Sequence, residues 1–162
     1  LTYTRLGTFF TNGTPAGLDG HTFVFGVQTL ASDVPTTGTA SYTGQAGGTA
    51  ALATGGAPVR VGGTSTLTAD FVTGAITTAF SLAYSTAGVT TALDILSGTG
   101  SIGANKPGFA GTLIGSGNVT GNFTGAFYGP QATEFGYDYI IGGTTAVGVG
   151  FTSVGAAFGK KD

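Results

Sequence analysis

Several residue types that define common protein classes are absent or scarce in this chain. Its 162 residues include no cysteine, no methionine and no tryptophan, and only 7% are charged. The absence of cysteine excludes disulfides, thiolate metal sites and cysteine nucleophiles. A formal net charge of −2, with an isoelectric point near 5.0, excludes the basic footprint that nucleic-acid binding requires.

Long apolar runs are also absent. No segment approaches the roughly 20 apolar residues of a membrane-spanning helix, so no transmembrane helix is expected. Because the chain begins at Leu1 and not at methionine, we expect a processed or truncated product. Removal of a secretory signal is the ordinary route to such a product.

Glycine, with 32 residues, and threonine are abundant instead. A hydrophobic content of 41% is too high for a disordered glycine-rich linker. Alternation of period two recurs along the whole chain, and no segment sustains a helical period. Strands are therefore expected over residues 1–10, 21–30, 38–52, 63–71, 75–85, 89–98, 109–117 and 121–129, with one or two more over 137–143 and 146–159.

Eight to ten antiparallel strands at this spacing predict a sandwich or a barrel. The many glycines within strands favour the barrel, because they permit the bends that closure requires. We predict an all-β fold, a single antiparallel β-barrel of about eight strands, with residues 1–162 forming one domain.

The stretch "GNFTGAFYGPQATEFGYDY" contains both a strand and its end. By alternation Phe123 and Phe127 share the core face, and Tyr128 lies on the other face. Pro130 ends the ladder because it has no N–H to donate. Glu134, one of only seven acidic residues, is expected to accept backbone N–H groups at this turn.

Part of that stretch, "GAFYGPQATEFG", is similar to the Gly-x-Phe-Tyr-Gly-Pro-x-Ala-x-Glu-x-Gly signature of the transferrin-binding protein B-like β-barrel domain of bacterial surface lipoproteins. The segments "YTRLGTF", "FVFGVQT", "PTTGTASYTGQAGG" and "GTSTLTADFVTGAIT" resemble the same family in the same order. The resemblance implies an eight-stranded, side-chain-filled barrel on the extracellular or outer-membrane surface of a Gram-negative bacterium. It also implies capture of host transferrin, haem or complement factors.

Few residues are candidates for a ligand site. By alternation the only histidine, His21, shares a face with Phe23 and Phe25, which would offer haem an axial ligand between aromatic walls. Tyr128 is a further candidate as a phenolate ligand. The competing interpretation of His21 is an ordinary histidine at a strand end, in which case no cofactor is bound.

The acidic residues do not form a site of their own. No cluster of aspartate, glutamate and histidine has the spacing of metal ligands, so no metal is expected. Asp70 and Asp94 lie within strands, and alternation predicts that both face solvent. We therefore predict no enzymatic activity and assign no catalytic residue.

Three functions remain open. The first is a secreted or cell-surface module that binds a protein, or a haem or iron carrier, through its loops. The second is a self-associating subunit of a surface layer or extracellular filament, which the low charge favours. The third is a small outer-membrane β-barrel, although the chain has no tryptophan belt. The candidate contact loops are residues 12–20, 31–37, 54–59, 100–108 and 129–135.

Overall fold

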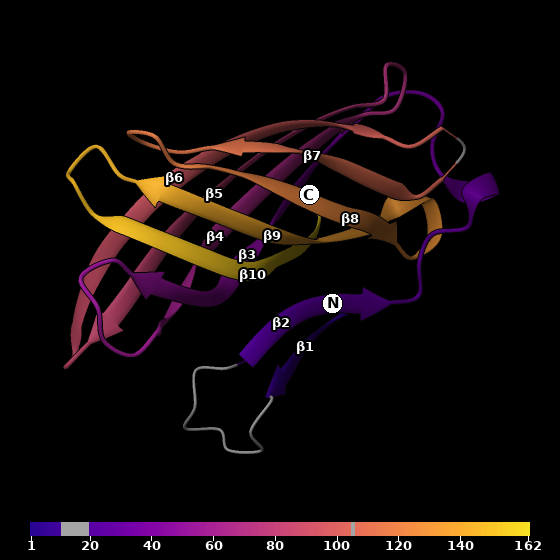
Figure 1. The fold of residues 1–162 in the computed structure, drawn as a ribbon. Helices are drawn as coiled ribbons and strands as arrows, with labels where there is room; N and C mark the ends of the chain where they lie inside the picture. The colour runs from indigo at the N-terminus through magenta and orange to yellow at the C-terminus, as the bar shows by residue number, and fades with distance from the viewer. Residues whose placement is uncertain (11–19, 105) are drawn as a thin grey trace.

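Eight strands close into an antiparallel barrel that contains most of the chain (Figure 1). The computed structural model describes residues 1–10, 20–104 and 106–162. Each barrel strand pairs with the next along the chain, and β10 closes the ring by pairing with β3. The strands are β3 (Thr39–Leu52), β4 (Val59–Asp70), β5 (Ala75–Thr86), β6 (Val89–Ile102), β7 (Gly108–Ile114), β8 (Thr120–Tyr128), β9 (Glu134–Thr144) and β10 (Gly150–Lys161). The prediction of an all-β barrel of about eight strands is confirmed.

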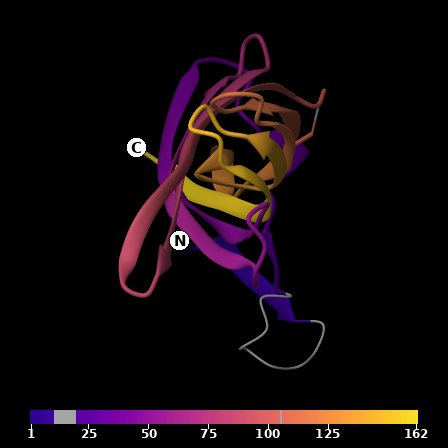
Figure 2. The same ribbon diagram turned by 60° about the vertical axis from the view of Figure 1, so that its left-hand side comes forward.

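The first two strands lie outside the barrel. β1 (Thr4–Phe10) and β2 (Gly20–Gly26) form a separate two-stranded antiparallel sheet, called the hairpin below. Figure 2 shows the hairpin beside the closed ring of strands and not within it. Alternation of period two is the same in both places, so the sequence pattern did not separate these strands from those of the barrel.

The barrel interior is filled by large side chains. Phe80, Phe123, Phe127 and Tyr137 are each at most 2% exposed. Their rings pack at centroid separations between 5.0 and 6.4 Å with one another or with neighbouring aromatic rings. The predicted core face of Phe123 and Phe127 is therefore confirmed, and the interior is a packed core.

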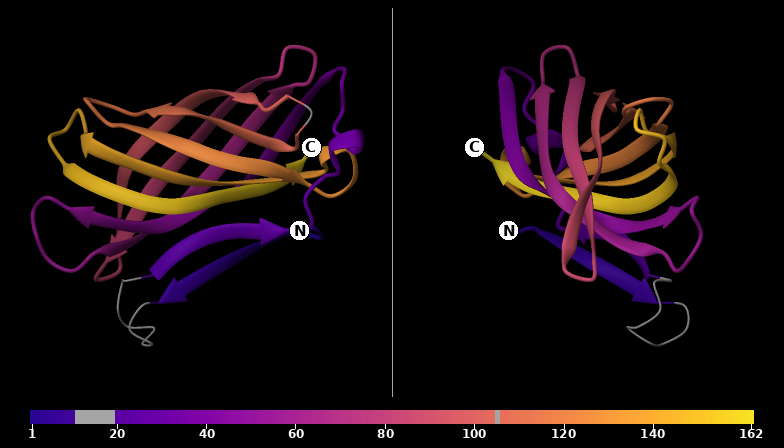
Figure 3. Two further views of the ribbon diagram at one scale, coloured as in Figure 1. Left: turned by 45° about the vertical axis from the view of Figure 1, so that its right-hand side comes forward. Right: turned by 90° about the vertical axis from the view of Figure 1, so that its left-hand side faces the viewer.

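The meander topology sorts the connections into two ends, which are well separated in Figure 3. End A contains the β4–β5, β6–β7 and β8–β9 connections together with the segment that enters β3. End B contains the β3–β4, β5–β6, β7–β8 and β9–β10 connections. Of the expected contact loops, residues 31–37, 100–104, 106–108 and 129–135 lie at end A, and 54–59 at end B. Residues 12–19 lie outside the described part of the chain.

The helical content is slight. Within the described ranges there are two 3₁₀ turns, η1 (Ala31–Asp33) and η2 (Pro130–Ala132), and no α-helix. The described residues accordingly contain no helix of the length and apolarity needed to cross a membrane.

Asp94 departs from the sequence-based prediction. Asp94 pairs with inward-facing Leu82 and lies two residues before buried Leu96, so alternation puts it on the inward face. The register shift follows only at Ala83 and leaves Leu93 as the extra residue on β6. Asp94 is buried, and its carboxylate accepts the backbone N–H groups of Ile95, at 2.9 Å, and Ser116, at 3.1 Å. The expectation that Asp94 faces solvent was wrong, because it required Ile95 to point inward, whereas Ile95 is 75% exposed.

Asp70 behaves differently from Asp94. It lies at the end of β4, where its carboxylate accepts the backbone N–H groups of Val72, at 2.8 Å, and Thr73, at 3.2 Å. These hydrogen bonds lower the pKa of Asp70. The carboxylate therefore stabilises the β4–β5 turn while staying at the surface.

Candidate functional site: end A and the hairpin it anchors

Glu134 attaches the start of the chain to the barrel. Its buried carboxylate accepts three consecutive backbone N–H groups, from Thr2 at 2.6 Å, Tyr3 at 3.0 Å and Thr4 at 2.7 Å. Burial raises the pKa of Glu134, but these hydrogen bonds outweigh it and hold the pKa below its usual value. Glu134 accepts backbone N–H groups, as predicted, but from residues about 130 positions away and not from its own turn.

The turn before Glu134 is shaped to receive this segment. Gly129 has φ 73°, and a Cβ at this position would lie 2.4 Å from the ring of Tyr3, so glycine is required for both reasons. Gln131 and Ala132 follow with φ of 52° and 57°, also in the left-handed region. The Ala132 carbonyl accepts the hydroxyl of buried Tyr42 at 2.8 Å, which holds the turn against the core.

The hairpin makes further contacts with the outer face of β9. The Val24 backbone N–H donates to Oδ1 of Asp138 at 3.1 Å. A Cβ on Gly136 would lie 2.3 Å from Cγ1 of Val24, so Val24 packs directly on the glycine backbone. Burial raises the pKa of Asp138, and its hydrogen bond from Val24 opposes that shift. Sequence reasoning missed both partners, because nothing local to either strand signals a contact across more than 100 residues.

Three of the four predicted ligand residues share the outer face of the hairpin. Phe23 and Phe25 are 41% and 50% exposed, with ring centroids 5.7 Å apart, and His21 is also exposed. The predicted shared face is therefore present. It is an open surface, whereas a haem site encloses most of the group between walls.

Tyr128 lies apart from these three residues. By register it faces outward from the barrel, as predicted, but it is only 5% exposed because the segment after β2 pairs with it through Gln28. Burial and the nearby charge of Asp138 raise the pKa of Tyr128. A phenol with a raised pKa stays protonated at neutral pH, which is opposite to what a phenolate ligand requires.

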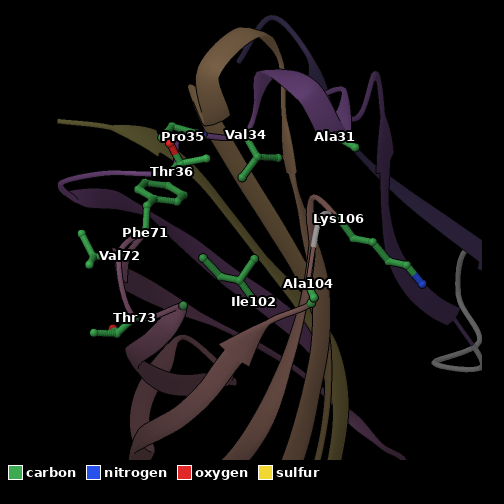
Figure 4. Close-up of a pocket in the computed structure, with 12 residues that line it drawn as sticks. Ala31, Val34, Pro35, Thr36, Phe71, Val72, Thr73, Ile102, Ala104 and Lys106 are labelled. Atoms are coloured by element: carbon green, nitrogen blue, oxygen red, sulfur yellow. The ribbon is translucent and has the colours of Figure 1, made fainter.

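A cleft of about 350 Å³ opens at end A. Figure 4 shows Val34, Phe71 and Ile102 approaching one another from three connections, with the ammonium group of Lys106 turned away from them. Phe71 is buried and continues into the core through its ring contact with Phe127, at 5.5 Å. The cleft thus combines apolar side chains with Thr36 and Thr73, has Lys106 at its edge, and joins loops that are far apart in the sequence.

The described side chains offer few groups for metal binding or catalysis. Within the described ranges no group of three or more histidine, aspartate and glutamate side chains is placed to hold a metal ion. The hydroxyl of buried Tyr137 lies 2.9 Å from Oγ1 of Thr78 and 3.2 Å from Oγ of Ser65, and burial raises its pKa. These groups satisfy one another inside the core, where no substrate reaches them.

Comparison with known families identifies the relatives of this barrel. The model of the C-lobe and N-lobe β-barrels of transferrin-binding protein B matches residues 34–161. The chain belongs to this family. The matched residues include the whole barrel and the signature turn, whereas the hairpin lies before the matched range. No curated protein sequence matches the chain.

Solved structures agree on the fold. Isotype 1 transferrin binding protein B from serogroup B Neisseria meningitidis is similar over 100% of this chain, with 22% identity and a TM-score of 0.68. A double mutant of transferrin binding protein B from Haemophilus parasuis Hp5 is similar over 99%, with 20% identity and a TM-score of 0.65. In both cases this chain spans 32% of the other chain, about a third of its length.

A third structure is the N-lobe domain of lactoferrin binding protein B of Moraxella bovis. It has 16% identity and a TM-score of 0.51, and the likeness covers 99% of this chain and 76% of that one. At such identities these likenesses show the fold alone. Because the alignments cover nearly all of this chain, the hairpin is included in them as well as the barrel.

Proposed function

We propose that this domain is a non-enzymatic binding module that grips a protein partner with the loops of end A. The observation that carries the proposal is the packed interior. Phe80, Phe123, Phe127 and Tyr137 fill the space in which a barrel of this size would hold a small ligand. Contact with a partner therefore takes place on the outside.

The composition of end A supports its use as the contact surface. Val72, on the rim of the cleft, is 69% exposed, and Leu30, just before η1, is 71% exposed. Val34, Pro35 and Ile102 add partly buried apolar surface within the cleft. Apolar surface concentrated in a depression suits a protruding side chain of a protein better than a metabolite, which requires several convergent polar groups.

The family suggests the class of partner. The relatives are named for binding transferrin and lactoferrin, so a host iron-carrier protein of this type is the first partner to test. We place the module on the extracellular side of the outer membrane of a Gram-negative bacterium, as is typical of the family. The proposed contact requires no cofactor and no haem at His21.

The outer face of the barrel favours the hypothesis of a water-exposed module and disfavours that of an outer-membrane barrel. Outward positions on neighbouring strands are exposed threonines such as Thr66, Thr77, Thr99, Thr112 and Thr124. A lipid-facing strand carries apolar residues outward and polar residues inward. In this barrel aromatic side chains fill most of the interior, and these five outward positions carry hydroxyl groups.

The test compares one exposed valine at each end of the barrel. Immobilised domain is titrated with transferrin and with lactoferrin, each with and without iron, and binding is measured by biolayer interferometry. Val72→Asp puts a charge on the rim of the end A cleft, and Val147→Asp is the matched control in the β9–β10 turn at end B, where Val147 is 85% exposed. We expect saturable binding that Val72→Asp weakens at least tenfold and Val147→Asp leaves unchanged.

Two results would overturn the proposal. Binding that is lost with Val147→Asp but kept with Val72→Asp would place the contact at end B. Absence of saturable binding to either carrier up to about 100 µM, far weaker than the usual range of specific protein complexes, would reject this class of partner.

A further inference from the structure

β1 is an edge strand that no other described strand covers. The hairpin has two strands, and β2 packs against β3, β9 and β10 while β1 makes fewer contacts with the barrel. Figures 1 and 3 show β1 on the side of β2 that faces away from the barrel. The backbone groups along the outer side of β1 are therefore positioned to pair with another strand.

The register identifies these backbone groups. Leu6 pairs with Val24, and the N–H of Val24 points to Asp138 instead of to β1. Leu6 and Val24 are thus a non-hydrogen-bonded pair, and the N–H and C=O of Leu6 point away from β2. The backbone N–H and C=O of Thr8, two residues further along β1, also point away from β2. Two residues before Leu6, the N–H of Thr4 is accepted by Glu134. Among the hydrogen bonds of the described residues, the one from a barrel side chain to this edge is thus at its first position.

The features that normally protect an edge strand are missing from β1. Proteins block such edges with proline, lysine, bulges or very short strands. β1 is seven residues long, contains neither proline nor lysine, and pairs with β2 without a register shift from Thr4 to Phe10. Arg5 is its single charged residue, and it lies near the end of the strand that Glu134 holds. Charge repulsion between two such edges is correspondingly small.

We propose that a second copy of this chain adds its β1 to this edge, giving a four-stranded antiparallel sheet with a two-fold axis at Gly7. Leu6 of each copy then lies opposite Thr8 of the other, and the two residues exchange both backbone hydrogen bonds. A two-fold interface is self-complementary, so one patch supplies both halves. This surface is distinct from end A, and the inference does not depend on the partner proposed for that end.

Gly7 is suited to the centre of such a sheet. In this register the two Gly7 residues form a non-hydrogen-bonded pair, in which the Cα atoms approach to about 4.5 Å. The ring of Phe23 already extends over Gly7, since a Cβ on this glycine would lie 2.5 Å from Cζ of Phe23. Pairing of two copies brings two Phe23 rings towards each other across the axis. The arrangement accounts for an aromatic side chain that is 41% exposed in the single chain.

The association is expected to be weak. One strand edge and a pair of rings bury less surface than a standard protein interface, so we expect a dissociation constant on the order of 10–100 µM. Sedimentation velocity of the 162-residue chain from about 5 to 500 µM should show a concentration-dependent shift from monomer to dimer. A single monomeric boundary over this whole range would overturn the proposal, and growth beyond a dimer would overturn the two-fold arrangement.

Leu6→Pro tests whether the backbone of β1 makes the contact. Proline removes the outward N–H of Leu6, which makes no bond to β2, so the pairing within the hairpin is kept. We expect the dissociation constant to rise at least tenfold. The matched control is Leu6→Ala, which keeps the N–H and should dimerise. A proline in a barrel strand, such as Thr66→Pro, would not serve as the control because β4 is paired on both sides. Equal dimerisation of Leu6→Pro and wild type would overturn the proposal.

A cysteine crosslink tests the register independently of stability. The chain has no cysteine, so Gly7→Cys introduces a single thiol on the proposed axis, where only the flexible tip of Phe23 must move aside. The matched control is Thr112→Cys, an exposed outward position on β7. Under mild oxidation we expect disulfide dimers of Gly7→Cys to form at least tenfold faster than those of the control. Equal rates for the two variants would overturn the register even if a dimer exists.

Discussion

The barrel and the hairpin have similar sequence patterns but are stabilised in different ways. Each barrel strand has a neighbour on both sides, and the barrel encloses an aromatic core. The hairpin has two strands, and a two-stranded sheet alone is only marginally stable in water. It depends on Glu134, on Asp138 and on packing of Val24 against Gly136. The barrel therefore stabilises itself, and the hairpin is stable because the barrel holds it.

The largest expected effect is in the barrel. Phe127 is fully buried, and its ring packs against Tyr42, Phe71 and Phe109 with centroids 5.0–5.8 Å apart. Phe127→Ala should lower the free energy of unfolding by about 3–5 kcal/mol, through lost burial and the cavity it leaves. Chemical denaturation followed by tyrosine fluorescence measures this loss. A loss well under 1 kcal/mol would show that Phe127 is not part of a tightly packed core.

A smaller and more local effect is expected from Glu134→Gln. The amide has only one acceptor oxygen for three N–H groups, and its own NH₂ group faces the donors. Leaving buried donors unsatisfied costs about 1–3 kcal/mol. Amide hydrogen exchange of Thr4, whose N–H Glu134 accepts, and of Gly7, which forms a hydrogen-bonded pair with Phe23, should accelerate while exchange in the barrel strands stays the same. Asp162→Asn, at the exposed end of the chain, is the control, and equal acceleration across the barrel would contradict a local anchor.

Acid should weaken the hairpin through the same carboxylate. The folded-state pKa of Glu134 lies below its ordinary value of 4.5, so its stabilisation is complete above pH 4.5 and is lost as pH falls through the folded pKa. The difference in hairpin exchange between wild type and Glu134→Gln should therefore be largest near neutral pH and vanish in strong acid. Asp138 is present in both proteins, so its contribution to the pH dependence cancels in this difference. That contribution has the opposite sign because the pKa of Asp138 is raised. A difference that stays constant down to pH 2 would contradict this role.

The smallest expected effect is that of Phe25→Ala. Phe25 is half exposed on the outer face of the hairpin, so its truncation should change the free energy of unfolding by no more than about 0.5 kcal/mol. The same chemical change in the barrel, Phe127→Ala, provides the comparison. A loss above about 2 kcal/mol would show that the outer face of the hairpin is covered in solution.

Much of the fold could be predicted from the sequence because alternation is a local property. Phe123 and Phe127 point inward by their spacing alone, and the end of β8 follows from Pro130. The signature around Glu134 predicted the family. The candidate site was less accessible to such reasoning. His21, Phe23 and Phe25 share a face as predicted, but the end A cleft joins three connections whose proximity depends on barrel closure.

The sequence by itself therefore determined the strands, the inward and outward faces of most of them, and a barrel filled by its own side chains. Only the tertiary structure decided what covers the outward face. Tyr128 points outward yet is buried, because a segment 100 residues away pairs with it. Asp94 points inward because β6 packs Leu96 into the core and leaves its neighbour Ile95 exposed. Period-two alternation tells which side of a strand a residue occupies, whereas its environment depends on contacts between segments far apart in the chain.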